Sequence, residues 1–540
     1  MIKRLLNKID SITIAALMVA LSSLLSRFLG IFRDRILGSE FGLGKTLDIY
    51  FAAFRIPDLI FNLIVLGALS AGFIPIFSQL IKKTSAKINH NKEAWEVANI
   101  IITILGFSLL VLSGIGILTA PYLMRVIAPG FNHEQQILTA NITRIMFLSP
   151  IFLGISSILG GVLQSYKRFF VYSLAPIVYN IGIIFGALFL TPIWGIYGLA
   201  YGVVLGAFLH MLVQVPSVIG LGYRPRINFD YKNKNVLKIA VMMVPRTLSL
   251  AVNQFNLLFI TIIASTLASG SLSVFNYANN LQTFPIGIFG ISFAIAAFPT
   301  LSAYAFDKKK LVDNFSATFR KILFFIVPAS VLLLTLRAQI IRVIFGAGQF
   351  DWEDTLLTMN TLNYFVISLF AQATIPLLVR VFYARHNSSI PFYVGFFSAT
   401  LNVVLSFTLS KTMGVTGLAL AFSIANIVNF LLLWTMLRME LGSMNELRIL
   451  ISTMKFSISA IASGFAIQGA KLFIWQYIDM TKTIGVFTQG AFAGISGIFI
   501  YILFSYLMRS EELFDFWYSL KRRIHGKKIE TGDRGEARGI

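Results

Sequence analysis

Long runs of apolar residues recur along the whole chain and restrict its fold more than any other feature of the sequence. A helix needs about 20 mostly apolar residues to cross the hydrocarbon core of a membrane. Runs of this length predict about fourteen membrane-spanning helices, at 12–32, 47–80, 97–124, 137–163, 169–191, 195–219, 237–267, 271–304, 315–344, 355–383, 390–410, 414–437, 450–476 and 484–508. We therefore predict an all-α polytopic membrane protein.

The charge balance excludes the soluble alternatives. Only 13% of the 540 residues are charged and 56% are hydrophobic, whereas about a quarter of the residues of a soluble domain are charged. The formal net charge is nonetheless +22, from 45 Lys and Arg against 23 Asp and Glu. A soluble nucleic-acid-binding protein reaches such a charge with many more charged residues. A soluble enzyme, a disordered chain and a DNA-binding protein are therefore excluded, and no nucleic-acid partner is expected.

The basic residues alternate between connections, which predicts the topology. Cytoplasmic loops of membrane proteins carry an excess of Lys and Arg. Every second connection here is basic: the N-terminus, then Lys82, Lys83, Lys87 and Lys92, Lys167 and Arg168, Arg224 to Lys234, Lys308 to Lys310, Arg380 and Arg385, Arg438 and Arg448, and the tail. Both termini are therefore expected in the cytoplasm. The basic start also resembles a signal peptide, but because many similar runs follow, we expect it to remain as the first span.

Four short motifs occur twice in the same order, which indicates an internal duplication. The segments at 125–130, 138–141, 166–168 and 195–200 recur at 342–348, 357–360, 383–385 and 414–419, offset by 217 or 219 positions. A repeat of six helices gives two copies of equal orientation, and transporters bind their substrate between such copies. We predict two pseudo-symmetric six-helix lobes, 1–220 and 221–440, around a central cavity, then two helices at 441–508 and a basic cytoplasmic tail at 509–540. The alternative is a duplication kept for structure alone.

Four arginines lie in or beside the predicted spans, where an ionised side chain is costly and usually faces the protein interior or a wet cavity. Arg27 and Arg33 belong to the first helix, Arg55 to the second and Arg246 to the seventh, where the repeat offset of 219 places it opposite Arg27. A guanidinium binds phosphate or carboxylate through two hydrogen bonds and keeps its proton. We predict these arginines to bind substrate. The alternative for each is a structural ion pair, or a side chain that reaches up to the membrane surface.

Neighbouring polar residues support this set, whereas acids are scarce elsewhere. Ser26 precedes Arg27, and Asp34 follows seven positions after Arg27 on the same helix face, as Asp48 lies seven before Arg55. The predicted spans of the second lobe contain no Asp or Glu. A cation-coupled pump, an acid–base enzyme or a metal enzyme would need carboxylates there. With no Cys and only five scattered His residues, we predict neither a metal site nor a cofactor, and a cationic cavity suited to an anion.

The motifs around these residues resemble the MurJ (MviN) family of lipid II flippases, in the multidrug/oligosaccharidyl-lipid/polysaccharide exporter superfamily. The resemblance covers 1–508 and is carried by SRFLGIFRD at 26–34, FAAFRIP at 51–57, GALSAGFIP at 67–75, FPIGIFG at 284–290, FPTLS at 298–302, RVIFGAGQF at 342–350 and FYARH at 382–386. It implies a carrier, not an enzyme. The cargo would be an undecaprenyl-pyrophosphate-linked peptidoglycan precursor, moved from the inner to the outer leaflet of the bacterial cytoplasmic membrane by alternating access. It also implies that Arg27 and Arg33 face the substrate with Asp34 and Asp48 as partners, and that 450–508 lines a groove for the lipid tail.

The sequence departs from the family pattern at two positions. Relatives have a further arginine on the second helix, where this chain has Phe61 and Asn62, and another on the eighth, where it has Asn280. We expect Arg55 and Arg246 to compensate, with Asn280 in a supporting role. The departures leave two alternatives open, a flippase for another polyprenyl-linked oligosaccharide and a drug exporter. A drug exporter that takes cations would need acids in its cavity.

Overall fold

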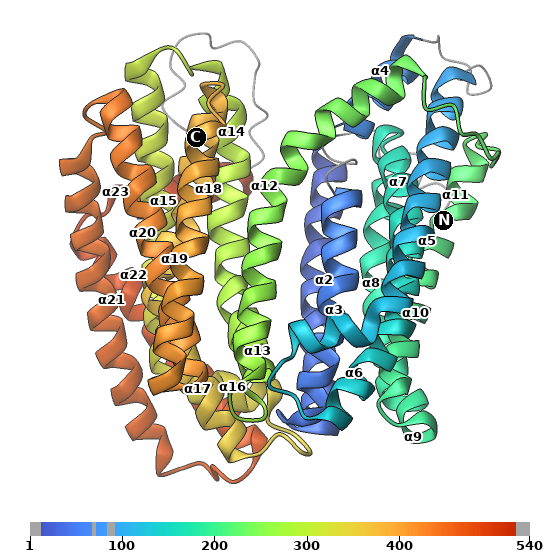
Figure 1. Ribbon diagram of the computed structural model, residues 1–540. Coiled ribbons are helices and arrows are strands. Elements are labelled where there is room, and N and C mark those ends of the chain that lie inside the picture. Colours follow the sequence, from blue (N-terminus) through green and yellow to red (C-terminus); the bar gives the residue numbers. More distant parts are fainter. Residues whose placement is uncertain (1–11, 67–71, 84–91, 525–540) are drawn as a thin grey trace. The chain divides into compact units, whose positions relative to one another are not determined.

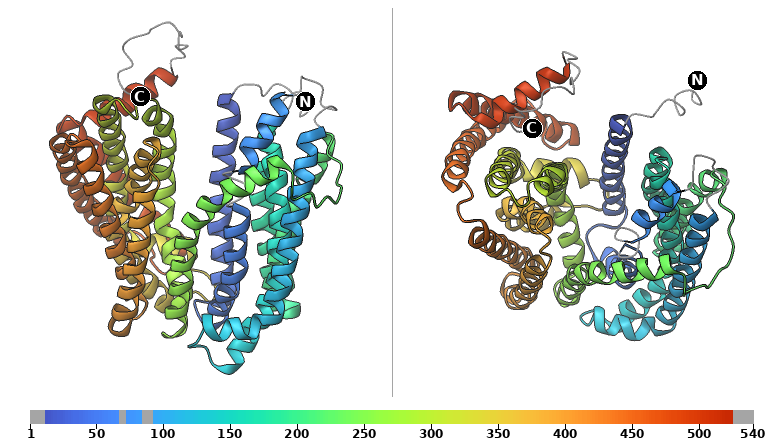
Figure 2. Two further views of the ribbon diagram at one scale, coloured as in Figure 1. Left: turned by 45° about the horizontal axis from the view of Figure 1, so that its top comes forward. Right: turned by 90° about the horizontal axis from the view of Figure 1, so that it is seen from above.

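The chain is helical throughout the described residues, which are 12–66, 72–83 and 92–524 of the computed structural model (Figure 1). These residues contain no β-strand. The chain divides into two compact units: unit 1 comprises Met1–Ser273 and Ala347–Phe350, and unit 2 comprises Val274–Gly346 and Asp351–Ile540. The long helices of each unit are seen end-on in the right-hand view of Figure 2, which shows each unit as a helix bundle.

Unit 1 contains the first seven predicted spans. Its helices are α2 (Ile12–Phe41), α3 (Lys45–Ile60), the π-helical turn η1 (Phe61–Leu66), α4 (Ile74–Lys83), α5 (Lys92–Ile127), α6 (His133–Met146), α7 (Leu148–Ser165), α8 (Phe169–Phe185), the π-helical turn η4 (Gly186–Leu190), α9 (Thr191–Trp194), α10 (Tyr197–Leu212), α11 (Val215–Gly220) and α12 (Lys234–Ser265). A buried apolar cluster joins α4, α5 and α7 around Phe73, Phe77, Leu105, Ile158 and Leu163. This cluster forms the core of the unit.

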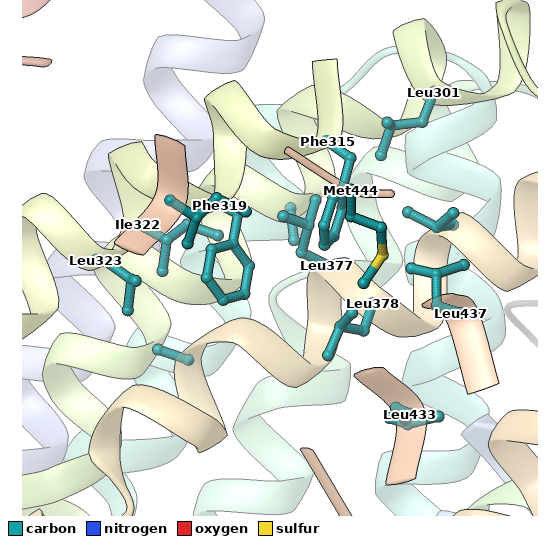
Figure 3. Close-up of a cluster of buried hydrophobic side chains, with 14 of the residues drawn as sticks. Leu301, Phe315, Phe319, Ile322, Leu323, Leu377, Leu378, Leu433, Leu437 and Met444 are labelled. Carbon is teal, nitrogen blue, oxygen red and sulfur yellow. The ribbon is translucent and has the colours of Figure 1, made fainter. Parts of the chain in front are cut away.

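Unit 2 contains the remaining spans. Its helices are α13 (Ser271–Pro285), the π-helical turn η5 (Ile286–Ile291), α14 (Ser292–Ala303), α15 (Lys308–Thr335), α16 (Arg337–Phe345), α17 (Trp352–Ile367), α18 (Leu369–Ala384), α19 (Ser389–Met413), α20 (Val415–Leu441), α21 (Glu446–Trp475), α22 (Thr483–Leu507) and α23 (Glu511–Ile524). The core lies where Phe315 and Phe319 of α15 meet Leu377 of α18 and Leu437 of α20 (Figure 3). α21 and α22 pack against each other, and α21 also packs on α15.

The helices confirm the prediction of an all-α polytopic membrane protein. Ten helices of the described residues are long and apolar enough to cross a membrane, or eleven if α17 and α18, which are bent by 46° at their junction, form one span. Three predicted spans are not among these eleven, namely the first, second and seventh, which correspond to α2, α3 to α4, and α12. Within the described part of α12, Leu250–Ser265 is a shorter apolar helix. These are the helices with the predicted site arginines, and the total of about fourteen stays a prediction.

The compact units end at a different place from the predicted lobes. The repeat places the boundary between 220 and 221, whereas unit 1 continues to Ser273. The physical reason is the packing of α12 on α3, η1 and α5. The fit is so close that a Cβ atom on Gly72 would lie 2.8 Å from Cγ2 of Ile239. The seventh helix therefore packs with the first six, although the repeat assigns it to the second copy.

Two loops from equivalent places in the repeat make equivalent contacts. In the first copy, a Cβ atom on Gly130 would lie 2.2 Å from the carbonyl oxygen of Ser265, at the end of α12. In the second copy, Gly348 has φ +55°, and its Cβ would lie 2.3 Å from the carbonyl oxygen of Ser39, near the end of α2. The same oxygen accepts a hydrogen bond of 2.8 Å from the main-chain nitrogen of Gln349. Each loop thus requires glycine because it packs directly on the end of a helix.

α8 and α10 approach each other through glycines. Gly182 and Gly186 on α8 and its π-helical turn face Gly202 and Gly206 on α10, and a Cβ on Gly182 would lie 2.3 Å from the Cα of Gly206. Glycines four residues apart let membrane helices approach so closely that their main chains touch. The contact sets the position of α8, which carries the polar residue Asn180 described below.

The C-terminal helix α23 is attached to the bundle by a buried ion cluster. Arg320 of α15 is only 7% exposed and forms ion pairs with Glu512 and Glu511 of α23. Ser452 of α21 donates a 3.0 Å hydrogen bond to Glu512, and Arg448 pairs with Glu511 at 2.7 Å. The tail was predicted as basic, but its described part begins with acids that bind the bundle. Residues 525–540 of that predicted tail lie outside the described residues.

We expect Gly202→Val to destabilise the protein, because the new side chain would meet the main chain of α8 at Gly186, which cannot move aside as a side chain can. Overpacking of this kind costs about 1–3 kcal/mol. Gly106→Val in α5 is the matched control, because a Cβ atom there has no other atom within 4 Å. Thermal unfolding of the purified protein in detergent measures the difference. Equal unfolding temperatures for the two variants would show that the α8–α10 contact is not tight.

We expect Arg320→Met to lower stability by about 3–5 kcal/mol, because it leaves the buried carboxylate of Glu512 without a counter-charge. The double variant Arg320→Met/Glu512→Gln removes both charges and should recover part of the loss. The same unfolding measurement compares the two. A double variant that is no more stable than the single one would contradict the ion-pair interpretation.

Candidate functional site

Arg33 of α2 lies at the centre of a polar cluster in unit 1. Its Nε and Nη2 donate hydrogen bonds of 2.9 and 2.7 Å to one carboxylate oxygen of Asp34, and Nη1 donates one of 3.2 Å to Oδ1 of Asn180 on α8. The Asp34 side chain is 3% exposed and that of Arg33 is 24% exposed. The carboxylate therefore fixes the guanidinium from one side and the amide from another, while part of the group stays accessible.

Asn180 joins this cluster to two helices. Its Nδ2 donates to the carbonyl oxygen of Pro176 within α8 at 3.0 Å and to that of Ser26 on α2 at 3.5 Å. Ser26 is thus bonded through its main chain in this contact. A buried amide with donors and acceptors in use resists displacement, because leaving either group unpaired in an apolar surrounding is costly. Asn180 therefore holds α2 and Arg33 in a defined position against α8.

α3 contributes a second arginine and a second acid. Nε of Arg55 donates a 2.6 Å hydrogen bond to Oγ1 of Thr261 on α12. Asp58 interacts electrostatically with both Arg55 and Arg33. Tyr50 also interacts electrostatically with Arg33. The cluster thus combines side chains of α2, α3, α8 and α12, and its two arginines are matched by two carboxylates.

Arg27 differs from the other arginines of unit 1. It lies six residues before Arg33 on α2 and is exposed, as are Phe28 and Phe32 beside it. No ion pair of Arg27 occurs among the described residues. Arg27 is therefore an exposed cation that no ion pair holds within the described part of the chain.

Asp48 has a different role from the predicted one. It is 4% exposed, and its Oδ2 accepts a 2.7 Å hydrogen bond from the main-chain nitrogen of Gly270. Its Oδ1 accepts bonds from the main-chain nitrogen of Ser273 at 2.8 Å and from its hydroxyl at 2.7 Å. The carboxylate binds the free main-chain N–H groups at the start of α13, where the helix dipole favours negative charge. Asp48 therefore fastens the start of α3 to residues 270–273, which also belong to unit 1, instead of pairing with an arginine.

The remaining predicted site residues contact none of the arginines described above in the hydrogen bonds that follow. The side chain of Arg246 lies outside the described part of the structure, although α12 itself is described. Asn280 belongs to unit 2 and is half-buried, and its carbonyl oxygen accepts a bond from Thr283. Asn62 donates a 2.8 Å bond to the carbonyl oxygen of Asp58. In this contact Asn62 stabilises its own helix.

The sequence prediction missed Asn180 and Thr261, which contact two of the predicted arginines. The available signal for Asn180 was a lone amide in the apolar run 169–191, whereas Thr261 is one of five Ser and Thr residues in the run 237–267 and has no distinguishing signal. Such residues also occur as structural hydrogen-bonding partners within a single helix, so their positions alone do not reveal the arginine partner. The described residues contain no group of three His, Asp or Glu side chains arranged to bind a metal ion.

Comparison with known proteins identifies the family. A family profile described as "Lipid II flippase MurJ" matches residues 37–487. A "Probable lipid II flippase MurJ" of Buchnera aphidicola subsp. Schizaphis graminum is 33% identical over 429 residues, which cover 77% of this chain and 81% of the relative. The "Lipid II flippase MurJ" of Burkholderia cenocepacia is 28% identical over 440 residues, covering 78% and 83%.

Solved structures share the fold. A structure titled "Lipid II flippase MurJ, inward closed conformation" superposes with a TM-score of 0.75 over 94% of this chain and all of that chain, at 23% identity. An inward-facing multidrug resistance MATE family transporter of the MOP superfamily gives a TM-score of 0.65 over 80% of this chain and 99% of the transporter, at 16% identity. The resemblance seen in the sequence motifs is thus confirmed, and the chain belongs to the lipid II flippase MurJ family.

Proposed function

We propose that this chain moves lipid II, the undecaprenyl-pyrophosphate-linked precursor of peptidoglycan, from the inner to the outer leaflet of the bacterial cytoplasmic membrane. It does so by alternating access, with its substrate site open to one leaflet at a time and both termini in the cytoplasm. Membership of the flippase family supports the transport activity. The observation that supports the anionic cargo is the exposed Arg27, which lacks a counter-charge among the described residues.

Arg27 and Arg33 divide the binding of the pyrophosphate between them. Arg27 offers a complete guanidinium fork, whose geometry matches two oxygens of a phosphate. Arg33 keeps its two bonds to Asp34 and can exchange the single bond from Nη1 to Asn180 for a phosphate oxygen. Because Asp34 neutralises much of the charge of Arg33, this second contact is weaker. A weaker contact favours release, which a carrier needs as much as binding.

Arg55 acts mainly as a positioning residue in this proposal. Its short bond to Thr261 joins α3 to α12, and the carboxylate of Asp58 lies within its electrostatic field. The arginine thereby keeps α12, the helix with Arg246, against the first helices of unit 1. We retain Arg246 as a substrate-binding candidate on the strength of the repeat, which pairs it with Arg27.

We expect the wild-type chain to rescue a bacterium depleted of its own lipid II flippase, and Arg27→Ala to fail although the protein reaches the membrane. Arg27→Lys should rescue in part, because an ammonium keeps the charge but not the fork. The readout is viability together with the amount of lipid II in the outer leaflet. Lys411→Ala is the control, since Lys411 is an exposed cation of α19 that lies over the ring of Phe407. Full rescue by Arg27→Ala would remove Arg27 from the mechanism.

We also expect Asn180→Leu to reduce transport more than it reduces the amount of protein in the membrane, because Arg33 then loses the acceptor for Nη1 and α2 loses its bond to α8. Asn180→Asp keeps an acceptor and should retain more activity than Asn180→Leu. Lipid II externalisation, normalised to membrane protein, measures both variants. Equal activities for the two variants would show that the hydrogen bond to Arg33 does not matter.

A flippase for another polyprenyl-linked oligosaccharide is the second candidate. It is favoured by the departures from the family pattern at Phe61, Asn62 and Asn280, where the resemblance implies arginines, so that fewer cations are available for the head group. The rescue experiment distinguishes the candidates, because a well-expressed chain that carries another glycan fails to restore lipid II export.

A further inference from the structure

Four polar side chains of unit 2 lie near the place where α16 packs on α22. Arg337 and Gln339 belong to α16, Lys471 to α21 and Gln489 to α22. The glutamines are 7% and 2% exposed, whereas both cations are only half-buried. Small residues allow this crossing, since a Cβ on Gly490 of α22 would lie 3.1 Å from Cβ of Gln339. The proposed functional site, which lies in unit 1, does not use this cluster.

Hydrogen bonds join the two cations to the end of α15, and join the two glutamines to each other and to the main chain of α21. Nζ of Lys471 donates to the carbonyl oxygen of Thr335 at 3.2 Å, and Nη1 of Arg337 donates to that of Leu334 at 2.8 Å. Nε2 of Gln339 donates to Oε1 of Gln489 at 2.8 Å, and Nε2 of Gln489 donates to the carbonyl oxygen of Lys471 at 3.3 Å. The cluster is therefore a fixed arrangement and not a set of independent surface side chains.

The positive charge of this cluster is not compensated by protein groups. Arg337 and Lys471 are close enough to interact electrostatically, and neither forms an ion pair within the described part of the chain. The nearby acid Asp479 pairs with Lys482 and accepts a bond from Thr481. The carbonyl groups at the end of a helix supply only about half a negative charge. The carbonyl groups at the end of α15 therefore leave more than one positive charge of Arg337 and Lys471 without compensation.

Two buried atoms of the cluster lack partners among the described residues. Nε of Arg337 is a hydrogen-bond donor, and Oε1 of Gln339 is an acceptor. A buried polar atom without a partner costs free energy, so such atoms call for a ligand or water that supplies the bond. The donor Nε of Arg337 matches an anionic oxygen, and the acceptor Oε1 of Gln339 matches a hydroxyl group.

The position of the cluster corresponds to the level of lipid head groups. α15 begins at Lys308–Lys310, on the side predicted as cytoplasmic, and its 28 residues extend about 42 Å at 1.5 Å per residue. The cluster at its far end therefore lies toward the outer leaflet. Trp475, the last residue of α21, and Tyr477 just beyond it are 60% and 74% exposed, as aromatic side chains are at a membrane–water interface.

We propose that Arg337, Lys471 and Gln339 form a binding site for a phosphate-bearing lipid of the outer leaflet. The guanidinium and the ammonium bind the phosphate oxygens, and Oε1 of Gln339 accepts a hydrogen bond from a hydroxyl near the phosphate. The assignment of this site to the outer leaflet rests on the proposed function, which places both termini of the chain in the cytoplasm. The lipid phosphate has two sources, a phospholipid such as phosphatidylglycerol and the polyprenyl pyrophosphate group that a flippase delivers to this leaflet.

Native mass spectrometry of the full-length protein in detergent tests the site directly. The probes are phosphatidylglycerol, phosphatidylcholine with the same acyl chains, and undecaprenyl pyrophosphate. We expect phosphatidylglycerol to bind in preference to phosphatidylcholine, whose choline cation the two basic side chains repel. Arg337→Gln/Lys471→Gln should weaken the binding about tenfold or more, because charge-assisted hydrogen bonds are lost. Lys482→Gln, which removes an exposed cation at the same end of α22, should leave it unchanged.

The outcomes separate the two sources of phosphate and test the site as a whole. Tighter binding of undecaprenyl pyrophosphate than of phosphatidylglycerol, lost in the double variant, assigns the site to the transport product, and the reverse order assigns it to a phospholipid. Gln339→Leu keeps both cations and should reduce binding of phosphatidylglycerol more than that of phosphatidic acid, which lacks the glycerol hydroxyls. Unchanged binding in both variants would overturn the proposal. Because no transport is measured, a chain that binds lipid but fails to rescue export contradicts only the proposed function.

Discussion

A charge inside a membrane protein costs free energy unless another polar group meets it, and this cost determines how the helices of both units are joined. In unit 1, Arg33 is met by Asp34 and by Asn180 of a different helix. In unit 2, Arg320 is met by two acids of the C-terminal helix. Apolar surface alone cannot select these contacts, because lipid tails are as apolar as leucine. The polar contacts and the close glycine packing therefore specify which helices meet.

The same cost explains why some parts of the fold could be predicted from the sequence and others could not. The spans follow from apolar length in the sequence. α2, α3 and α12 carry the polar residues of the candidate site, and apolar length does not predict which partners those residues contact. The boundary of unit 1 depends on the packing of α12, and the repeat does not reveal it because a duplicated helix can pack with either copy.

The candidate site could be predicted only in part. The arginines stand out in an apolar sequence, and the pairing of Arg33 with Asp34 involves neighbours in the chain. The bond between Asp48 and the start of α13 joins residues 222 or more positions apart. It depends on free main-chain N–H groups, which every helix start has, so no residue type marks the partner. Asn180 shows the same difficulty, because its partner Arg33 lies 147 positions away.

The ion cluster of α23 has a consequence for biosynthesis. Arg320 is made about 190 residues before the acids that neutralise it. At the roughly 5–20 residues per second typical of translation, the growing chain carries this buried cation without its partners for about ten seconds or more. A chain that ends before Glu511 never acquires them. The last described helix therefore completes the assembly of unit 2, and a truncated protein would keep an uncompensated charge that membrane quality control can recognise.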